Sequence, residues 1–163
     1  MNEHAPAIFQ ALEASSFATG IRASTWAYMT ANVGHILFLF LFACSIAVMD
    51  LRMTGALAAT TPGYVIGTAR KFAMAAFAGM IVTGFVLFAA EASHVALNPV
   101  FQIKVVLILL GLLNVAWFQF KIEPLIRNLP PLTPLPSSAR TAGIVSLTTW
   151  LLVAACGRSI AYF

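Results

Sequence analysis

Histidine has the widest scope for chemistry of any residue type in this chain, which contains three: His4, His35 and His94. His35 lies about nine residues into the first long apolar run, about 13 Å from its start if the run is helical. An imidazole at that depth in a bilayer is costly unless it has a partner or a ligand. Tyr28 and Asn32 share a helix face with it. His35, with Asn32 and Tyr28 beside it, is a candidate axial ligand for haem or another tetrapyrrole, or a copper ligand. The alternative is a polar face that is satisfied inside a helix bundle.

His94 is the second candidate metal ligand, and it follows Glu91 just beyond the second apolar run. The same helical rise places it near the outer interface, roughly 10 Å above His35. Two axial histidines of a haem need matching heights on facing helices, so a His35–His94 pair is not favoured, whereas one histidine with another ligand stays open. For cofactors the sequence therefore favours none, then copper, then haem b.

Three charged residues lie at the outer ends of three different apolar runs: Glu91, Lys104 and Arg158. The ends of these runs are neighbours in an antiparallel bundle, and an unpaired charge near the hydrocarbon is expensive. We therefore expect a structural charge cluster in which Glu91 contacts at least one of the two cations. The functional alternative is an anion or proton site that opens outward.

Motifs for hydrolytic or group-transfer chemistry are absent from the sequence. It has no Gly-rich phosphate loop, no H-E-x-x-H, no C-x-x-C and no nucleophile elbow, and no pair of carboxylates shares a site. The sequence therefore predicts a protein that is not an enzyme.

The amino-acid composition indicates the class of protein that holds these residues. Apolar residues make up 61% of the 163 and charged residues 9%, against roughly 45–50% and 25% in soluble domains. The mean hydropathy is +0.93. These values exclude a soluble globular enzyme, a disordered chain and a secreted disulfide scaffold, and they predict a membrane protein.

The apolar runs predict the architecture. A spanning helix needs about 20 mainly apolar residues, and long lipid-exposed runs can only be helices. The predicted fold is an all-α integral membrane four-helix antiparallel bundle, a single domain over 1–163, with a short N-terminal amphipathic surface helix. A pre-helix packed on the bundle is the alternative for that first segment. The surface helix is expected at about 6–15, and the spans at about 26–49, 72–92, 101–120 and 140–158.

Basic residues in the connecting segments indicate the orientation. Segments 50–71 and 121–140 carry six Lys and Arg residues, and the other connections and termini carry three. The positive-inside rule then places both termini in the periplasm, if the protein is a multi-pass protein of the bacterial inner (cytoplasmic) membrane. Asp50 and Arg52 are interpreted as interfacial anchors. The proline-rich segment 121–140 is expected to form an extended connector.

Several segments together resemble small bacterial four-helix inner-membrane proteins of unknown function. They are distantly similar to the membrane domain of copper-resistance D-type (CopD-like) proteins. The resemblance implies the fold and the membrane location, and it makes His35 and the set Glu91, Lys104 and Arg158 the site residues carried over. The segments are His35-Ile-Leu, Ser45 to Gly55, Glu91-Ala, Asn98 to Lys104, Leu112-Leu-Asn114 and Gly157 to Phe163.

Three functions follow from these observations. The first is a non-catalytic accessory or scaffold subunit of a larger inner-membrane assembly, with the bilayer and a membrane-protein partner or a second copy as its contacts. The second is CopD-like copper handling at the periplasmic face. The third is electron transfer by a haem or other tetrapyrrole bound at His35. Nucleic acid is not an expected partner, because the basic residues form no stripe and have no interleaved aromatic platform.

Overall fold

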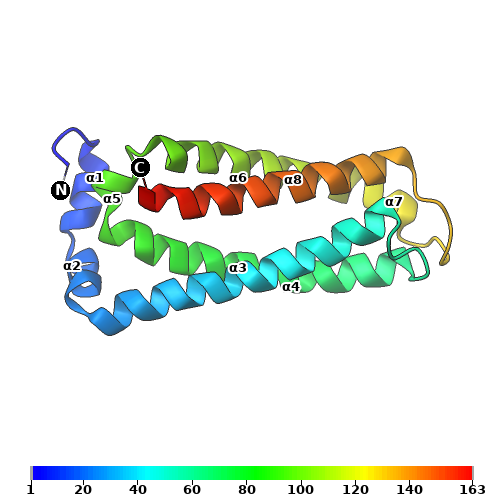
Figure 1. Ribbon diagram of the computed structural model, residues 1–163, viewed down its shortest axis with the longest axis horizontal. Coiled ribbons are helices and arrows are strands. Elements are labelled where there is room, and N and C mark those ends of the chain that lie inside the picture. The colour runs from blue at the N-terminus through cyan, green and yellow to red at the C-terminus, as the bar shows by residue number, and fades with distance from the viewer. Residues whose placement is uncertain (1, 163) are drawn as a thin grey trace.

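The computed structural model describes residues 2–162, which form helices and no strand. Four long helices cross the molecule, and each runs antiparallel to the one before it in the chain (Figure 1). They are α3 (Thr25–Thr54), α4 (Pro62–Ala90), α6 (Pro99–Trp117) and α8 (Ser137–Ser159). All four are long and apolar enough to cross a membrane. The predicted all-α, membrane-type bundle is confirmed.

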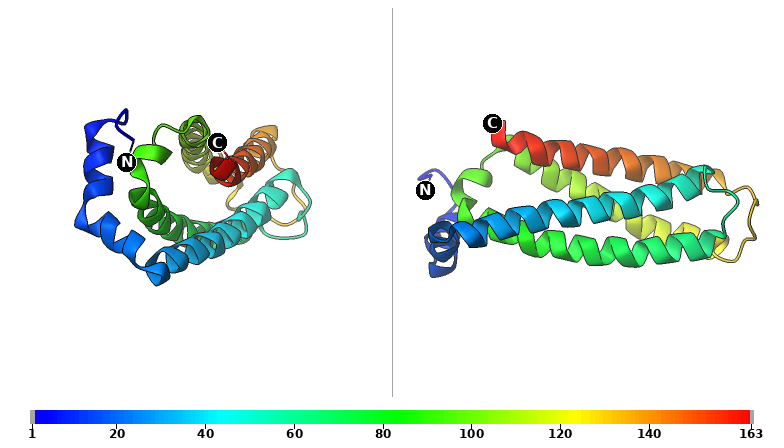
Figure 2. Two further views of the ribbon diagram at one scale, coloured as in Figure 1. Left: turned by 60° about the vertical axis from the view of Figure 1, so that its left-hand side comes forward. Right: turned by 60° about the horizontal axis from the view of Figure 1, so that its bottom comes forward.

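Short helices cover the two ends of the bundle. One end, called the terminal end below, carries both ends of the described chain (Figures 1 and 2). Helices α1 (Ala7–Ala14), α2 (Ser16–Ala23) and α5 (Ala92–Val95) and the 3-10 turn η2 (Ile160–Tyr162) lie there. The opposite end, called the loop end, carries the π-helical turn η1 (Phe118–Ile122), α7 (Glu123–Ile126) and the α3–α4 and α7–α8 connections.

The N-terminal segment is helical, but it forms two helices that pack on the bundle. Helix α1 contacts α5, and α2 contacts α3 and α4. Glu13 of α1 is buried against α5, whereas Ile8 is 72% exposed. The segment therefore lies across the terminal end, and its packing matches the alternative of a packed pre-helix.

Helix α4 begins ten residues before the predicted second span. Gly55 ends α3 in a left-handed conformation, with φ of 99°, and its neighbour Ala56 donates a hydrogen bond to the Leu51 carbonyl. Only a short connection follows before Pro62, which occupies the first turn of α4, where its missing N–H costs nothing.

Proline also starts a helix in the segment for which the sequence predicts an extended connector. Helix α6 continues through η1 into α7, and Pro124 lies in the first turn of α7. The prediction of an extended chain from residue 121 was wrong for this part. The non-helical connection is confined to residues 127–136.

The core lies mainly between α3 and its two neighbours. Helix α3 packs on α4 and α8, and α6 packs on α8 but scarcely touches α4. An aromatic group formed by Phe42, Phe77 and Trp150 fills the centre, with Phe42 and Trp150 edge-to-face at 4.8 Å. Helices α4 and α6 meet at the terminal end, where Phe88 stacks on Phe101 at 5.4 Å.

Candidate functional site

His35 is hydrogen-bonded across the interface between α3 and α4. Its Nδ1 atom lies 2.9 Å from the Thr83 hydroxyl, which itself donates to the Gly79 carbonyl at 2.7 Å. Because the Thr83 hydrogen is used there, Nδ1 carries the proton that His35 donates, and Nε2 is left with its lone pair. Gly84 makes room for the ring, because a Cβ at that position would lie 3.1 Å from His35 Cε1. The imidazole is thus fixed in orientation, with Nε2 as its ligand-competent atom.

Asn32 and Tyr28, the two residues expected beside His35, form no hydrogen bond with it in the described part of the chain. Asn32 is exposed and Tyr28 is 37% exposed. The partner of His35 is Thr83 of α4 instead. The hydrogen bond that holds His35 thus comes from a second helix, and the expectation that Asn32 and Tyr28 lie beside His35 at a cofactor stays a prediction.

His94 belongs to a different region from His35. It is exposed on α5 and lines an open pocket at the terminal end that His35 does not reach. That pocket is lined by Asn2, Glu3, His4, Glu13, Glu91, Ser93 and His94. Among the described residues no three His, Cys, Asp or Glu side chains are arranged to hold a metal ion.

The three outer charges lie at the terminal end but have separate surroundings. Glu91 is exposed, and Lys104 is half-buried with its Nζ beside Gly157. Arg158 donates to the Tyr162 hydroxyl at 2.6 Å and also lies over that ring, 4.8 Å from its centroid. No ion pair joins the three charges in the described part of the chain. The expected cluster therefore stays a prediction.

Glu13 anchors the N-terminal helices, a role that the sequence did not indicate. Its carboxylate accepts hydrogen bonds from the Ser93 backbone N–H at 2.8 Å and from the Ser93 hydroxyl. Burial raises the pKa of Glu13, but the opposing effects, of which the two bonds from Ser93 are the largest, hold the pKa below its usual value. Arg22 completes the anchor by donating to the Ala90 carbonyl at 2.8 Å and the Glu13 carbonyl at 2.9 Å.

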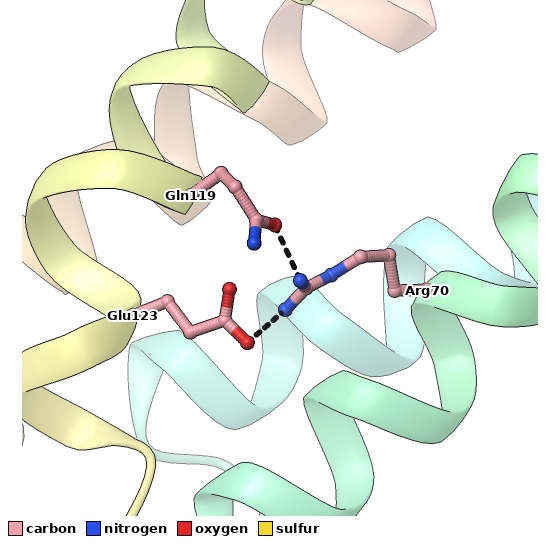
Figure 3. Close-up of polar contacts among 3 residues, drawn as sticks. All are labelled: Arg70, Gln119 and Glu123. Atoms are coloured by element: carbon pink, nitrogen blue, oxygen red, sulfur yellow. Dashed lines mark hydrogen bonds and ion pairs between the residues drawn. The ribbon is translucent and has the colours of Figure 1, made fainter.

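Arg70 ties α4 to the continuation of α6 at the loop end. Its guanidinium points across to Gln119 and Glu123 (Figure 3). It forms an ion pair with Glu123 at 2.6 Å and donates to the Gln119 side-chain oxygen. Gln119 lies in the π-helical turn and Glu123 directly follows it. Arg70 therefore bridges α4 and α6 at the end opposite to the Phe88–Phe101 stack.

Asp50 and Arg52 are buried, so their interpretation as interfacial anchors was wrong. Each is only 1% exposed. Arg52 donates from Nε to the Thr60 carbonyl at 3.1 Å and so holds the α3–α4 connection. The cause is the early start of α4 at Pro62, which extends the packed bundle past both residues. The burial of Asp50 and Arg52 was not predicted because the second span was expected to begin only at residue 72.

These features define a multi-pass membrane protein built on a four-helix bundle, with polar side chains that join neighbouring helices at both ends. The chain belongs to DUF6644, a family of unknown function, whose model matches residues 9–163. No curated protein and no solved structure matches it.

Proposed function

We propose that this protein is a non-catalytic accessory or scaffold subunit of a larger inner-membrane assembly, and that it joins this assembly through α6. The exposure of α6 carries the proposal. Gly111 is the one buried residue of Pro99–Trp117. In the most apolar 18-residue stretch of this span only 6% is buried inside the protein, against 39% in the corresponding stretch of α3.

Two further observations support the proposal. Helix α6 packs on α8 alone among the long helices, so the contact with α4 that would close the bundle is nearly missing along most of its length. Transmembrane helices associate by close packing rather than by a hydrophobic driving force. A helix of a partner protein can therefore form the most packing contacts with α6, the helix that this bundle leaves least covered. His35 and Arg70 have hydrogen-bonding partners between helices, which is the expected role of polar groups in a scaffold.

Photo-crosslinking in native membranes tests this proposal. A photo-reactive amino acid replaces Leu109 or Leu113 of α6, which are 55% and 66% exposed. The matched control replaces Phe40 of α3, which is 71% exposed. We expect one discrete protein adduct from both α6 positions and only lipid adducts from position 40. An adduct with a second copy would make the assembly a homo-oligomer. Equal labelling at all three positions would contradict the proposal.

A tetrapyrrole function is the second candidate, and the Nε2 atom of His35 is the observation that favours it. The Thr83 hydrogen bond fixes the tautomer in the form that a haem iron requires. A haem would supply one-electron chemistry there. An absorption spectrum of the protein purified from its native membrane should then show a Soret band, and His35→Gln should remove it. A colourless preparation would contradict the tetrapyrrole function.

CopD-like copper handling is the third candidate, and the arrangement of side chains argues against it. His35 and His94 lie in separate surroundings, and the described residues offer no group of three ligands. Metal analysis of the same preparation tests this conclusion, since stoichiometric copper would contradict it.

A further inference from the structure

Asp50 is a buried acid with no charged partner. It is the only aspartate of the chain. The residue is 1% exposed, and within residues 2–162 neither carboxylate oxygen accepts a hydrogen bond. Asp50 is therefore a carboxyl group in the packed core that is shielded from solvent and has no hydrogen-bond donor at its oxygens.

The groups around Asp50 are mostly small or apolar. Its backbone lies against Gly143 of α8, where a Cβ would approach the Asp50 carbonyl oxygen to 3.4 Å. Met49 and Met53 flank it on α3, and both are buried. Ser146 of α8 is the neighbouring hydroxyl and is itself buried. This contact between α3 and α8 offers the carboxyl group no positive charge.

The cations of the loop end have other surroundings. On α3 itself, Arg52 points to the Thr60 carbonyl, and two residues of separation place it away from Asp50 around the helix. On α4, Arg70 is paired with Glu123. The remaining cations at this end are exposed, namely Lys71 of α4, Lys121 of η1, Arg127 directly after α7, and Arg140 of α8. None of them forms an ion pair with Asp50 in the described part of the chain.

A carboxylate in such a place must be neutralised. Transfer of an isolated charge into a low-dielectric interior costs far more than a protein's net stability, so the group binds a counterion or takes up a proton. The described residues supply too few ligands for a metal ion around Asp50. A proton is the one counterion that needs no further ligands.

We propose that Asp50 is a proton-binding site in the core of the bundle, and that the packing of α3 on α8 depends on the bound proton. Loss of the proton leaves a carboxylate between Gly143 and Ser146, with its charge unbalanced. The folded bundle is then destabilised as the pH rises, because the unfolded chain can hydrate the charge and the folded core cannot. This inference does not rest on the accessory role proposed above.

The single aspartate allows a direct test on the wild-type protein. Cell-free synthesis with aspartate labelled with carbon-13 in its side-chain carboxyl gives one labelled carboxyl group, at Asp50. In nanodiscs at about pH 7 we expect the signal of a protonated carboxyl group, in potassium, sodium or choline buffer alike. A carboxylate signal at about pH 6 overturns the proposal. A carboxylate signal in sodium buffer that becomes a carboxyl signal in choline buffer also overturns it, because the ligand is then a metal cation.

A matched pair of variants tests the dependence of packing on the proton. Asp50→Asn keeps the shape and removes the titration, and Glu91→Gln removes an exposed carboxylate as a control. Between about pH 5 and pH 7, where the unfolded chain has lost this proton and the folded protein keeps it, we expect the thermal midpoint to fall by about 4 °C or more for wild type and Glu91→Gln, and to stay constant for Asp50→Asn. An equal fall in all three proteins contradicts the proposal. If Asp50→Asn does not fold, the labelled wild-type carboxyl signal decides alone.

Discussion

The Nδ1 atom of His35 and the hydroxyl of Thr83 lie 2.9 Å apart, and this hydrogen bond joins α3 to α4 in the half of the bundle nearest the termini. Thr83 is also bonded to the Gly79 carbonyl, one turn earlier on its own helix. The histidine most suited to bind a cofactor is therefore also a link between two helices. The two roles use different ring nitrogens and are compatible.

Thr83→Val should destabilise the bundle, because it keeps the shape of the side chain but leaves the Nδ1 hydrogen of His35 without an acceptor. We expect a loss of about 1 kcal/mol, the usual net value of one hydrogen bond with some added cost for the group left unpaired. Thr83→Ser retains the hydroxyl and should lose less. Thermal unfolding in one detergent compares the three proteins, and equal midpoints for the valine and serine variants would show that the bond contributes nothing.

The bridge between Arg70 and Glu123 should show strong coupling. Their side chains are 20% and 17% exposed, so loss of one partner leaves a poorly hydrated charge. We expect Glu123→Gln and Arg70→Met to destabilise the bundle singly, and the double variant to recover part of the loss. The coupling should be about 1 kcal/mol or more in a double-mutant cycle. Purely additive losses would mean that Arg70 depends on Gln119 alone.

The fold was predictable from sequence because its cause is local. Runs of about 20 apolar residues have no stable form in lipid except the helix, so hydropathy alone predicts four helices. The helix ends were harder to predict. Residues 62–71 include Arg70 and Lys71, whose charges suggested a loop, yet Pro62 starts a helix and packing keeps both residues in it.

The partners of the polar residues were not predictable from sequence. His35 was recognised because a histidine inside an apolar run is conspicuous, but its partner Thr83 is 48 residues away and looks like any threonine of an apolar helix. Asp50 resembled an anchor because it ends an apolar run. Only the three-dimensional position of Gly143 shows that α8 covers it. Such contacts depend on how helices rotate against each other, which the hydrophobic pattern fixes weakly in uniformly apolar segments.

The attachment of the N-terminal helices should be sensitive to acid. The pKa of Glu13 lies below its usual value in the folded protein, so the carboxylate stabilises the folded state at and above the pKa of the unfolded chain. That contribution is lost as the pH falls through the folded value, and the bonds from Ser93 lose their charged acceptor. Hydrogen exchange in residues 7–23 should then rise at acid pH, before exchange in the long helices rises. In Glu13→Gln it should already be raised at neutral pH and change little with acid.

Both termini should face the periplasm. Both ends of the described chain lie at one end of the bundle (Figure 1), and the six basic residues of segments 50–71 and 121–140 indicate the cytoplasm for the other end. In a background with Cys44 and Cys156 replaced, a single cysteine at position 4 should react with a membrane-impermeant maleimide in intact cells. Cysteines at positions 60 and 132 should react only after the membrane is opened. The reverse pattern would invert the orientation.

Two glycines of α4 should respond oppositely to the same substitution. Gly63 lies so close to the end of α7 that a Cβ would be 2.2 Å from the backbone oxygen of Arg127, which cannot move aside as a flexible side chain can. At Gly67, by contrast, a Cβ would have no neighbouring heavy atom within 4 Å. Gly63→Ala should therefore cost about 1–3 kcal/mol by overpacking. Gly67→Ala, one turn further along the same helix, should be neutral or stabilise the bundle by roughly 0.5–1 kcal/mol, because alanine loses less backbone entropy in a helix. Thermal unfolding of the two variants in the same detergent makes the comparison, and equal effects would mean that α4 and α7 are not in close contact.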